Sequence, residues 1–155
     1  MRPIHTLVWH CTASRETSSQ SIADVRRFHM QVNKWRDVGY HLLVRRDGSV
    51  ELGRPESQVG AHVAGHNMGT LGYAYEGGLD ATGRAKDTRT AAQKATMLRL
   101  TEQAIARHRL RRVTGHRDLS PDLNGDGIIS PSEWTKQCPC FDASSEYMPL
   151  IRKAA

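Results

Sequence analysis

The chain has 155 residues, the length of a single domain, and 38% of them are hydrophobic while 25% are charged. This composition excludes a disordered, collagen-like or coiled-coil protein, and no apolar run reaches the roughly 18 residues that a membrane span needs. The formal net charge of +6 suits a polyanionic partner and equally a merely soluble protein; since no nucleic-acid motif is present, we expect no nucleic-acid partner. Three cysteines cannot all pair within one chain, which argues against a disulfide framework.

The first elements predicted along the chain are a strand and a helix. Residues 6–10 form a short apolar run that indicates a buried strand. Ser21 followed by Asp24 is a capping-box pattern, and apolar residues recur after it at helical spacing, which predicts a helix over residues 21–33. The residues that recur at this spacing are Ile22, Val25, Phe28 and Val32.

A hairpin and a further strand follow. Asp47-Gly48 separates two β-prone runs, residues 40–46 and 49–53, and an Asp-Gly pair in that setting is a strong hairpin signal. Residues 71–76 predict another strand, which ends at a pair of glycines.

The second half of the chain is predicted to be mostly helical. Thr90 with Gln93 begins a long amphipathic helix over residues 90–108. Its inward side is predicted to hold Met97, Leu98 and Ile105. A strand and two short helices are then expected over residues 112–115, 131–136 and 145–153. This order predicts an α/β (α+β) fold, a central mixed β-sheet flanked by helices, in one domain spanning residues 1–155.

Three potential metal ligands stand at or near strand ends. His10 ends the first strand, His116 ends a later strand, and Cys138 lies in the loop that follows. Two imidazoles and one thiolate are good zinc ligands, and three protein ligands leave the fourth tetrahedral position open to water, which is the pattern of a catalytic zinc site. The spacing does not by itself bring these residues together, and a strand-end histidine can equally be structural.

Five segments, in order, resemble the type-2 N-acetylmuramoyl-L-alanine amidases, a family that includes short phage endolysins and the peptidoglycan recognition proteins. The segments are residues 8–14, 38–48, 60–67, 115–118 and 136–139. The resemblance covers about residues 5 to 142, and five motifs in the same order are far more specific than any one of them.

The resemblance implies a role for each matching residue. His10, His116 and Cys138 would hold zinc, while Tyr40 and Lys136 would complete the site as donors to the oxyanion that amide attack generates. The residues implied for contact with sugar or stem peptide are His62, His66 and Asn67.

The remaining cysteines and His41 are predicted to be structural. Cys11 follows His10 on a strand, so its side chain should point to the opposite face and into the core. Cys140 is expected not to bind metal, although a swap of ligand role between Cys138 and Cys140 stays open. His41 should face away from Tyr40.

A segment between His116 and Lys136 departs from the short endolysins. Residues 122–133 match the twelve-position EF-hand loop, with Gly127 at the sharp turn and Ser130 at the water-mediated position. The calcium ligands predicted on this basis are Asp122, Asn124, Asp126, Ile128 and Glu133. Residues 116–121 look extended, so no entering helix is expected, and the loop would serve to fix the segment that delivers Lys136. The alternative is a capped, Asx-rich turn without metal.

The resemblance implies a zinc-dependent peptidoglycan hydrolase that cleaves the amide between N-acetylmuramic acid and L-alanine, as in endolysin-like lysis. Two alternatives stay open: a cytoplasmic muropeptide-recycling amidase, whose relatives use aspartate as third ligand, and a non-catalytic recognition module, which usually lacks the cysteine. The N-terminal segment lacks a charged lead and apolar core, so we expect synthesis in the cytoplasm without a signal peptide. Action on the wall would follow release by holin-type permeabilisation or a secretion machine. Peptidoglycan is the expected partner of a monomer with no stable membrane association.

Overall fold

The computed structural model describes residues 2–154. Its elements in chain order are β1 (Thr6–Cys11), β2 (Ser14–Arg15), α1 (Ile22–Gln31), β3 (Leu42–Val44), β4 (Val50–Leu52), β5 (Thr70–Tyr75), β6 (Gly78–Leu79), α2 (Ala91–His108), β7 (Arg112–Gly115), η1 (His116–Leu119), η2 (Pro131–Glu133) and α3 (Ala143–Ala154). Both η elements are short 3-10 helices.

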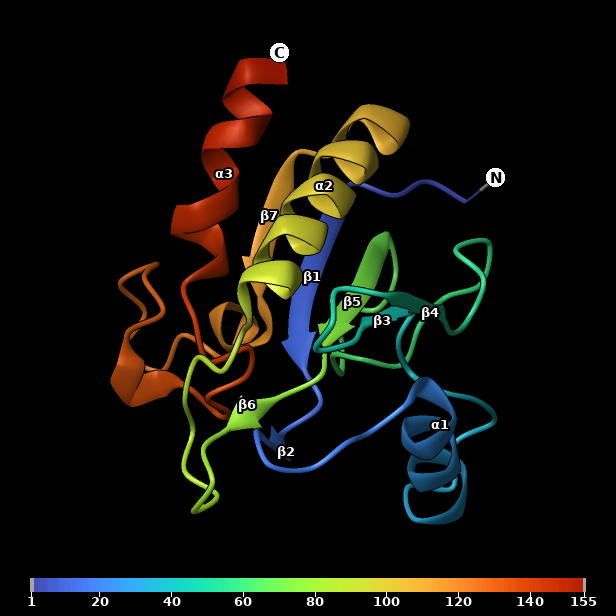
Figure 1. The fold of residues 1–155 in the computed structure, drawn as a ribbon. Coiled ribbons are helices and arrows are strands. Elements are labelled where there is room, and N and C mark those ends of the chain that lie inside the picture. Colours follow the sequence, from blue (N-terminus) through green and yellow to red (C-terminus); the bar gives the residue numbers. More distant parts are fainter. Residues whose placement is uncertain (1, 155) are drawn as a thin grey trace.

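The central sheet has five strands in the order β4-β3-β5-β1-β7, and Figure 1 shows it behind α2. β1 pairs in parallel with both β5 and β7, β3 pairs in parallel with β5, and only the β3–β4 hairpin is antiparallel. The predicted mixed sheet is therefore confirmed. Because the carboxyl ends of parallel strands meet at one edge, β1 and β7 deliver their last residues to the same place.

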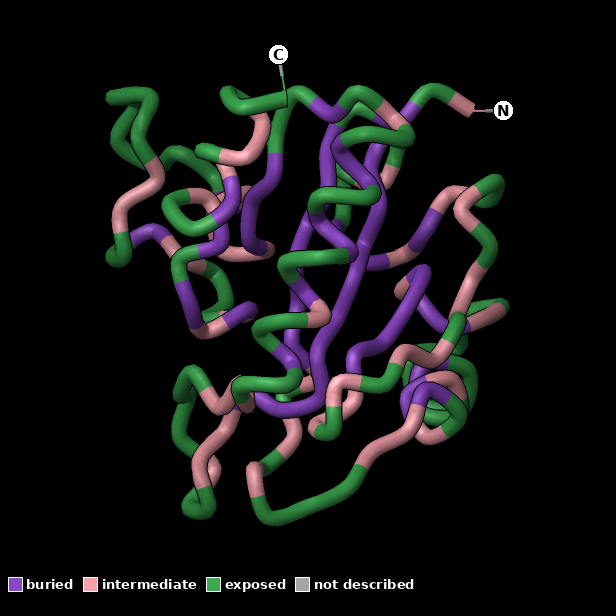
Figure 2. Tube along the Cα trace, turned by 45° about the horizontal axis from the view of Figure 1, so that its top comes forward, coloured by how far each residue is buried: buried purple, intermediate pink, exposed green. Residues whose placement is uncertain are grey.

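The two faces of the sheet are covered differently. Alternate residues of β1, among them Trp9 and Cys11, enter the main core, which α2 and α3 cover. The Trp9 indole donates a hydrogen bond of 3.1 Å to the Thr101 hydroxyl on α2. The opposite face is covered by α1 through a smaller cluster that includes Val25 and Leu43. The strands β1, β3 and β5 are buried along their whole length, whereas the edge strand β4 is intermediate to exposed; Figure 2 shows the buried strands in purple at the centre of the molecule.

The helix starts are as predicted, but some of the inward positions are not. Both capping boxes are present, at Ser21 and at Thr90. Phe28 is 52% exposed and Val32 is 61% exposed, although both belong to the apolar spacing that predicted the helix, because His29 takes the inward position on the last turn of α1. Leu98 on α2 is likewise an exposed hydrophobic residue, whereas its neighbour Met97 is fully buried. Apolar spacing alone did not identify which side of each helix meets the sheet.

Three short segments also differ from the sequence predictions. Residues 116–119 form η1 instead of an extended segment, and the helix predicted over 131–136 is only the three-residue η2. The two-residue strands β2 and β6, which pair in parallel as a second small sheet, were not predicted. Among residues 2–154, no helix is both long and apolar enough to cross a membrane.

Candidate functional site

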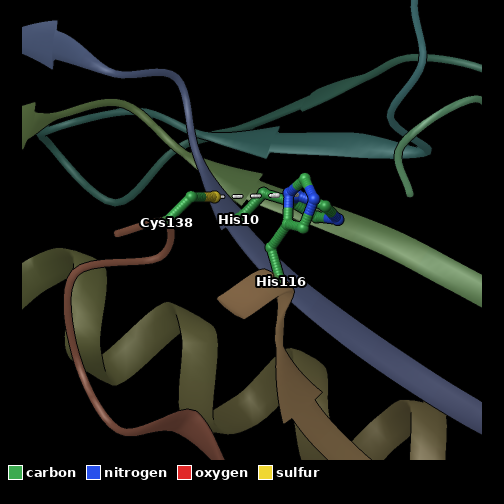
Figure 3. A group of neighbouring side chains, drawn as sticks. All are labelled: His10, His116 and Cys138. Atoms are coloured by element: carbon green, nitrogen blue, oxygen red, sulfur yellow. Dashed lines mark hydrogen bonds between the residues drawn. The ribbon is translucent and has the colours of Figure 1, made fainter. Parts of the chain in front are cut away.

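The three predicted metal ligands come together at one edge of the sheet. His10 lies near the end of β1, and His116 follows directly on β7; these strands are parallel neighbours with Trp9 opposite Gly115. Cys138 reaches the same point from the loop after η2, and Figure 3 shows the three side chains pointing toward one another. Within the described part of the chain, this is the only group of three or more His, Cys, Asp or Glu side chains whose ligand atoms lie close enough together to share one metal ion.

The distances within this group fit a tetrahedral zinc ion. His10 Nδ1 lies 3.1 Å from His116 Nδ1 and 3.7 Å from Cys138 Sγ, and all three ligand atoms lie within 4.8 Å of one another. Bond lengths of about 2.0 Å to nitrogen and 2.3 Å to sulfur at tetrahedral angles place two such nitrogens roughly 3.3 Å apart and a nitrogen roughly 3.5 Å from a sulfur. The donor set of two imidazoles and one thiol is also the one zinc prefers, so these residues fit the metal.

The two histidines are held in the neutral form that a metal requires. Burial lowers the pKa of His10 well below its ordinary value, and the neighbouring histidines and Lys136 lower it further. Burial, followed by the charge of Lys136, lowers the pKa of His116 to about 4. Since a metal binds the unprotonated nitrogen, ligand competence near neutral pH is already present in the protein.

The Cys138 loop is held by contacts from three directions. The backbone N–H of Cys11 donates to Cys138 Sγ over 3.3 Å, and the backbone N–H of Arg117 donates to the Cys138 carbonyl over 2.8 Å. One residue further along, the Pro139 carbonyl accepts a hydrogen bond of 2.6 Å from the buried Tyr75 hydroxyl. The thiol is therefore placed by β1, η1 and β5 together.

The other two cysteines lie outside the ligand group. Cys11 is buried in the main core, on the face of β1 opposite His10, as predicted. Cys140 Sγ lies 4.0 Å from Cys11 Sγ, and both are free thiols. The structure thus brings Cys138 rather than Cys140 to the histidines.

Tyr40 and Lys136 line the same cavity as Cys138 and His116. The ring of Tyr40 lies 5.1 Å from that of His10, centroid to centroid. Burial, with a contribution from Cys138, raises the pKa of Tyr40 well above its ordinary value, so the phenol keeps its proton and can donate a hydrogen bond. Lys136 is exposed on the loop between η2 and Cys138.

The three predicted groove residues occupy distinct environments. His66 is exposed and lines a groove of about 1040 Å³ that also reaches His116 and Lys136. Asn67 lines the same groove, but its side-chain oxygen accepts the backbone N–H groups of His62 and Val63, at 2.9 and 3.0 Å. His62 is only 6% exposed, and its Nδ1 lies 3.0 Å from His10 Nε2.

His41 and His29 hold backbone segments beside the site. His41 Nδ1 accepts the Gly72 backbone N–H at 3.0 Å, and His29 Nδ1 accepts the Gly39 backbone N–H at 2.9 Å. Burial lowers the pKa of both imidazoles. His41 is therefore structural, as the sequence predicts.

Sequence reasoning missed two contributors to the site. Trp35 borders both cavities, and its ring packs on His29 with centroids 4.6 Å apart. Thr70, at the start of β5, lies 3.2 Å from His62 Nε2 through its hydroxyl. An exposed tryptophan is a recognisable signal for a binding surface, whereas nothing in the sequence singles out this threonine.

The predicted calcium loop has most of its oxygens occupied by its own backbone. Asp122 accepts the N–H groups of Gly125 and Gly127, and Glu133 accepts those of Leu123, Asn124 and Ser130. The carboxylates of residues 122–133 form no cluster of three metal-type groups in the described chain. The structure therefore lends no support to calcium binding at Asp122, Asn124, Asp126, Ile128 and Glu133, which stays a prediction from the sequence.

Comparison with known families and proteins defines the class. A family model described as N-acetylmuramoyl-L-alanine amidase matches residues 1–140. An endolysin of Klebsiella phage KP32 is 33% identical over 133 residues, which are 86% of this chain and 78% of that protein. An uncharacterized protein of Haemophilus influenzae is 48% identical over 99 residues, 64% of this chain and 85% of that protein.

Solved structures agree on the fold. The amidase LysC of Clostridium intestinale superposes with a TM-score of 0.72 at 21% identity, covering 99% of this chain and 86% of that one. Drosophila peptidoglycan recognition protein SD superposes with a TM-score of 0.65 at 24% identity, covering 90% and 76%. Fold and sequence together define the class of the protein, which is that of the amidases that act on peptidoglycan. The chain belongs to the N-acetylmuramoyl-L-alanine amidase family, within the type-2 superfamily that includes phage endolysins and peptidoglycan recognition proteins.

Proposed function

We propose that this amidase is zinc-dependent, with His10, His116 and Cys138 as the metal ligands, and that it hydrolyses the amide between N-acetylmuramic acid and L-alanine. The observation that carries the proposal is the convergence of these three side chains at distances that suit tetrahedral zinc. The cavities lined by His116 and Lys136 give the amide of a peptidoglycan strand a route to that point.

Zinc, when bound, would supply Lewis-acid chemistry, lowering the pKa of water toward about 7 and polarising the scissile carbonyl. Tyr40 contributes a protonated phenol, because burial keeps its pKa high. Lys136 contributes an ammonium group from the exposed loop that lines the same cavity. Both are donors for the carbonyl oxygen as negative charge develops on it, and one such donor is typically worth a few kcal/mol. Water adds, the C–N bond breaks, and the products are the lactyl carboxylate and the free amine of L-alanine.

The groove gives the glycan and stem peptide their contacts. His66 is exposed along the larger groove, and Trp35 stands where the two cavities meet. An indole face suits the C–H surface of a sugar ring, while an imidazole suits its hydroxyl groups. Asn67 contributes indirectly, because its side-chain oxygen accepts two backbone N–H groups of the loop that carries His66.

The proposed cellular role is lysis of the wall after synthesis in the cytoplasm, as for the phage endolysins that the chain resembles. Support comes from Cys138, since the recycling amidases place aspartate at the third ligand position. Parallel assays on intact sacculi and on soluble anhydro-muropeptides would separate the two roles. A lytic enzyme should release peptide from sacculi efficiently, whereas a recycling enzyme should prefer the soluble fragments.

Metal analysis with mass spectrometry of digested sacculi tests the chemistry. We expect close to one zinc per chain, and products with a free L-alanine amino group beside intact, unsubstituted muramic acid. Cleavage within the glycan or within the peptide would refute the reaction. Full activity after exhaustive treatment with a chelator would refute the metal.

A further inference from the structure

His62 is buried between the proposed ligand His10 and the hydroxyl of Thr70. Its Nδ1 lies 3.0 Å from His10 Nε2, and its Nε2 lies 3.2 Å from Thr70 Oγ1. Thr70 Oγ1 in turn lies 2.9 Å from the His66 carbonyl oxygen and 3.0 Å from the Asn67 carbonyl oxygen. These contacts form a continuous chain from a loop backbone to a proposed metal ligand.

The direction of every proton in this chain is fixed by its far end. The Thr70 oxygen lies only 2.9 and 3.0 Å from two carbonyl oxygens that can only accept, and contacts this short between oxygens require the hydroxyl proton to lie between them. The single hydroxyl proton of Thr70 is therefore donated to His66 or Asn67 and not across the longer 3.2 Å contact to His62. The Thr70 oxygen is then available to His62 Nε2 only as an acceptor, so that nitrogen carries the proton. A neutral imidazole has one N–H, which leaves His62 Nδ1 as an acceptor.

The next step sets the tautomer of His10. Since His62 Nδ1 accepts, His10 Nε2 must be the donor across their 3.0 Å contact. The unprotonated nitrogen of His10 is then Nδ1, the atom that lies 3.7 Å from Cys138 Sγ and 3.1 Å from His116 Nδ1. The lone pair is therefore directed to the point where the three ligand atoms converge.

The backbone around His62 also fixes the orientation of its ring. A Cβ atom added at Gly72 would collide with the His62 ring, and one added at Gly60 would meet its Cδ2 atom. Two glycines thus form a tight seat, in which the ring packs against backbone on β5 and in its own loop. A ring held this closely keeps Nδ1 toward His10 and Nε2 toward Thr70.

We infer that His62 and Thr70 are positioning residues that hold His10 in the Nε2–H tautomer and so aim its Nδ1 lone pair at the metal. This inference rests on the proposed function for the identity of the ligand, and it gives His62 a role other than the sugar contact predicted from the sequence. Partners of this kind, which bond the second nitrogen of a ligating histidine, typically change metal affinity by 10- to 100-fold.

Imidazole ¹⁵N NMR of the full-length protein tests the tautomer directly, with and without zinc. We expect His10 to give the shifts of an Nε2–H imidazole in both samples, and His62 likewise. A wild-type His10 protonated at Nδ1 would overturn the inference. Because this readout needs no substrate, a failure of the proposed amidase reaction would leave its result unaffected, so the two failures are distinguishable.

Zinc affinity, measured by competition with a chromophoric chelator, tests the positioning role. We expect His62→Leu to weaken zinc binding by about 10- to 100-fold and Thr70→Val by about tenfold, with Thr70→Ser close to wild type because it restores the hydroxyl. Met68→Gln, a change at a side chain in the same loop that is 76% exposed, is the matched control and should keep wild-type affinity. Thermal melts verify that each variant is folded. Wild-type affinity in a folded Thr70→Val or His62→Leu protein would overturn the inference.

Discussion

The backbone N–H of Cys11 donates a hydrogen bond to the sulfur of Cys138 over 3.3 Å, although the two residues lie 127 positions apart. The donor is the residue immediately after His10, so β1 places one proposed ligand through its side chain and steadies another through its backbone. The contact fixes the sulfur at the point where the two histidine nitrogens converge.

Replacement of Cys138 should remove the metal. In Cys138→Ala the proposed site keeps only two ligands, so we expect zinc content near zero and no detectable release of peptide from sacculi. Cys140→Ala, a change two residues away at a thiol outside the ligand group, is the matched control and should retain zinc and activity. Zinc is measured by elemental analysis of the purified proteins. Zinc loss in the Cys140 variant with retention in the Cys138 variant would reverse the assignment.

Removal of the Tyr40 hydroxyl should slow the reaction without loss of zinc. Tyr40→Phe keeps the ring packed near His10 but removes one donor to the oxyanion, so we expect kcat to fall by about 10²–10³-fold. Tyr147→Phe, in the main core and away from the cavity, should leave kcat unchanged. Steady-state kinetics on a soluble muropeptide, with zinc measured in parallel, check the prediction. A wild-type kcat for Tyr40→Phe would exclude its role.

Loss of the Lys136 ammonium should also act on kcat. Lys136→Met preserves much of the apolar stem and removes the charge, and we expect kcat to fall by about 10²-fold with zinc retained. The charge also helps keep the pKa of His116 low, so protons should compete with zinc for His116 at a higher pH in this variant. Lys94→Met, an exposed change on α2, serves as control. An effect on KM alone would point to substrate binding instead.

Metal-free protein should lose stability as the pH falls below about 6.5. The pKa of His62 is lowered to about 3 and that of His116 to about 4, in each case mainly by burial. Between those pKa values and pH 6.5, the histidines of the unfolded chain bind protons that the folded chain does not bind. The free energy of unfolding is therefore highest above pH 6.5 and declines as the pH drops below it. Each such histidine contributes a slope of about 1.4 kcal/mol per pH unit. Urea unfolding at pH 8, 7, 6 and 5 measures this; equal stability at pH 7 and 5 would contradict it.

Glu133 should stabilise its loop whether or not calcium binds. Its carboxylate accepts three backbone N–H groups, from Leu123, Asn124 and Ser130, so Glu133→Gln should lower Tm in the presence of a calcium chelator. The EF-hand pattern further predicts that added calcium raises the Tm of the wild type. A wild-type Tm that is identical with calcium and with chelator would contradict calcium binding by this loop.

The sequence by itself determined the parts of the structure that depend on local chemistry. Asp47-Gly48 predicted the β3–β4 hairpin because an Asp-Gly pair accepts the turn geometry, and Ser21 and Thr90 predicted helix starts because their side chains cap free N–H groups. The alternation of side chains along β1 predicted that His10 and Cys11 would face opposite ways. The ordered motifs identified the family and named the three residues that the fold brings together.

Only the tertiary structure decided which side chains are enclosed and what they contact. Periodicity predicts one apolar side of α1, but Phe28 is exposed because His29 turns inward to accept the Gly39 N–H. His62 falls in a polar loop motif, yet its ring packs against Gly72 of β5 and contacts His10, which lies 52 positions away in the sequence. The burial of these side chains, their hydrogen-bond partners and their tautomers are set by contacts between segments far apart in the chain. No pattern along a single segment predicts such contacts.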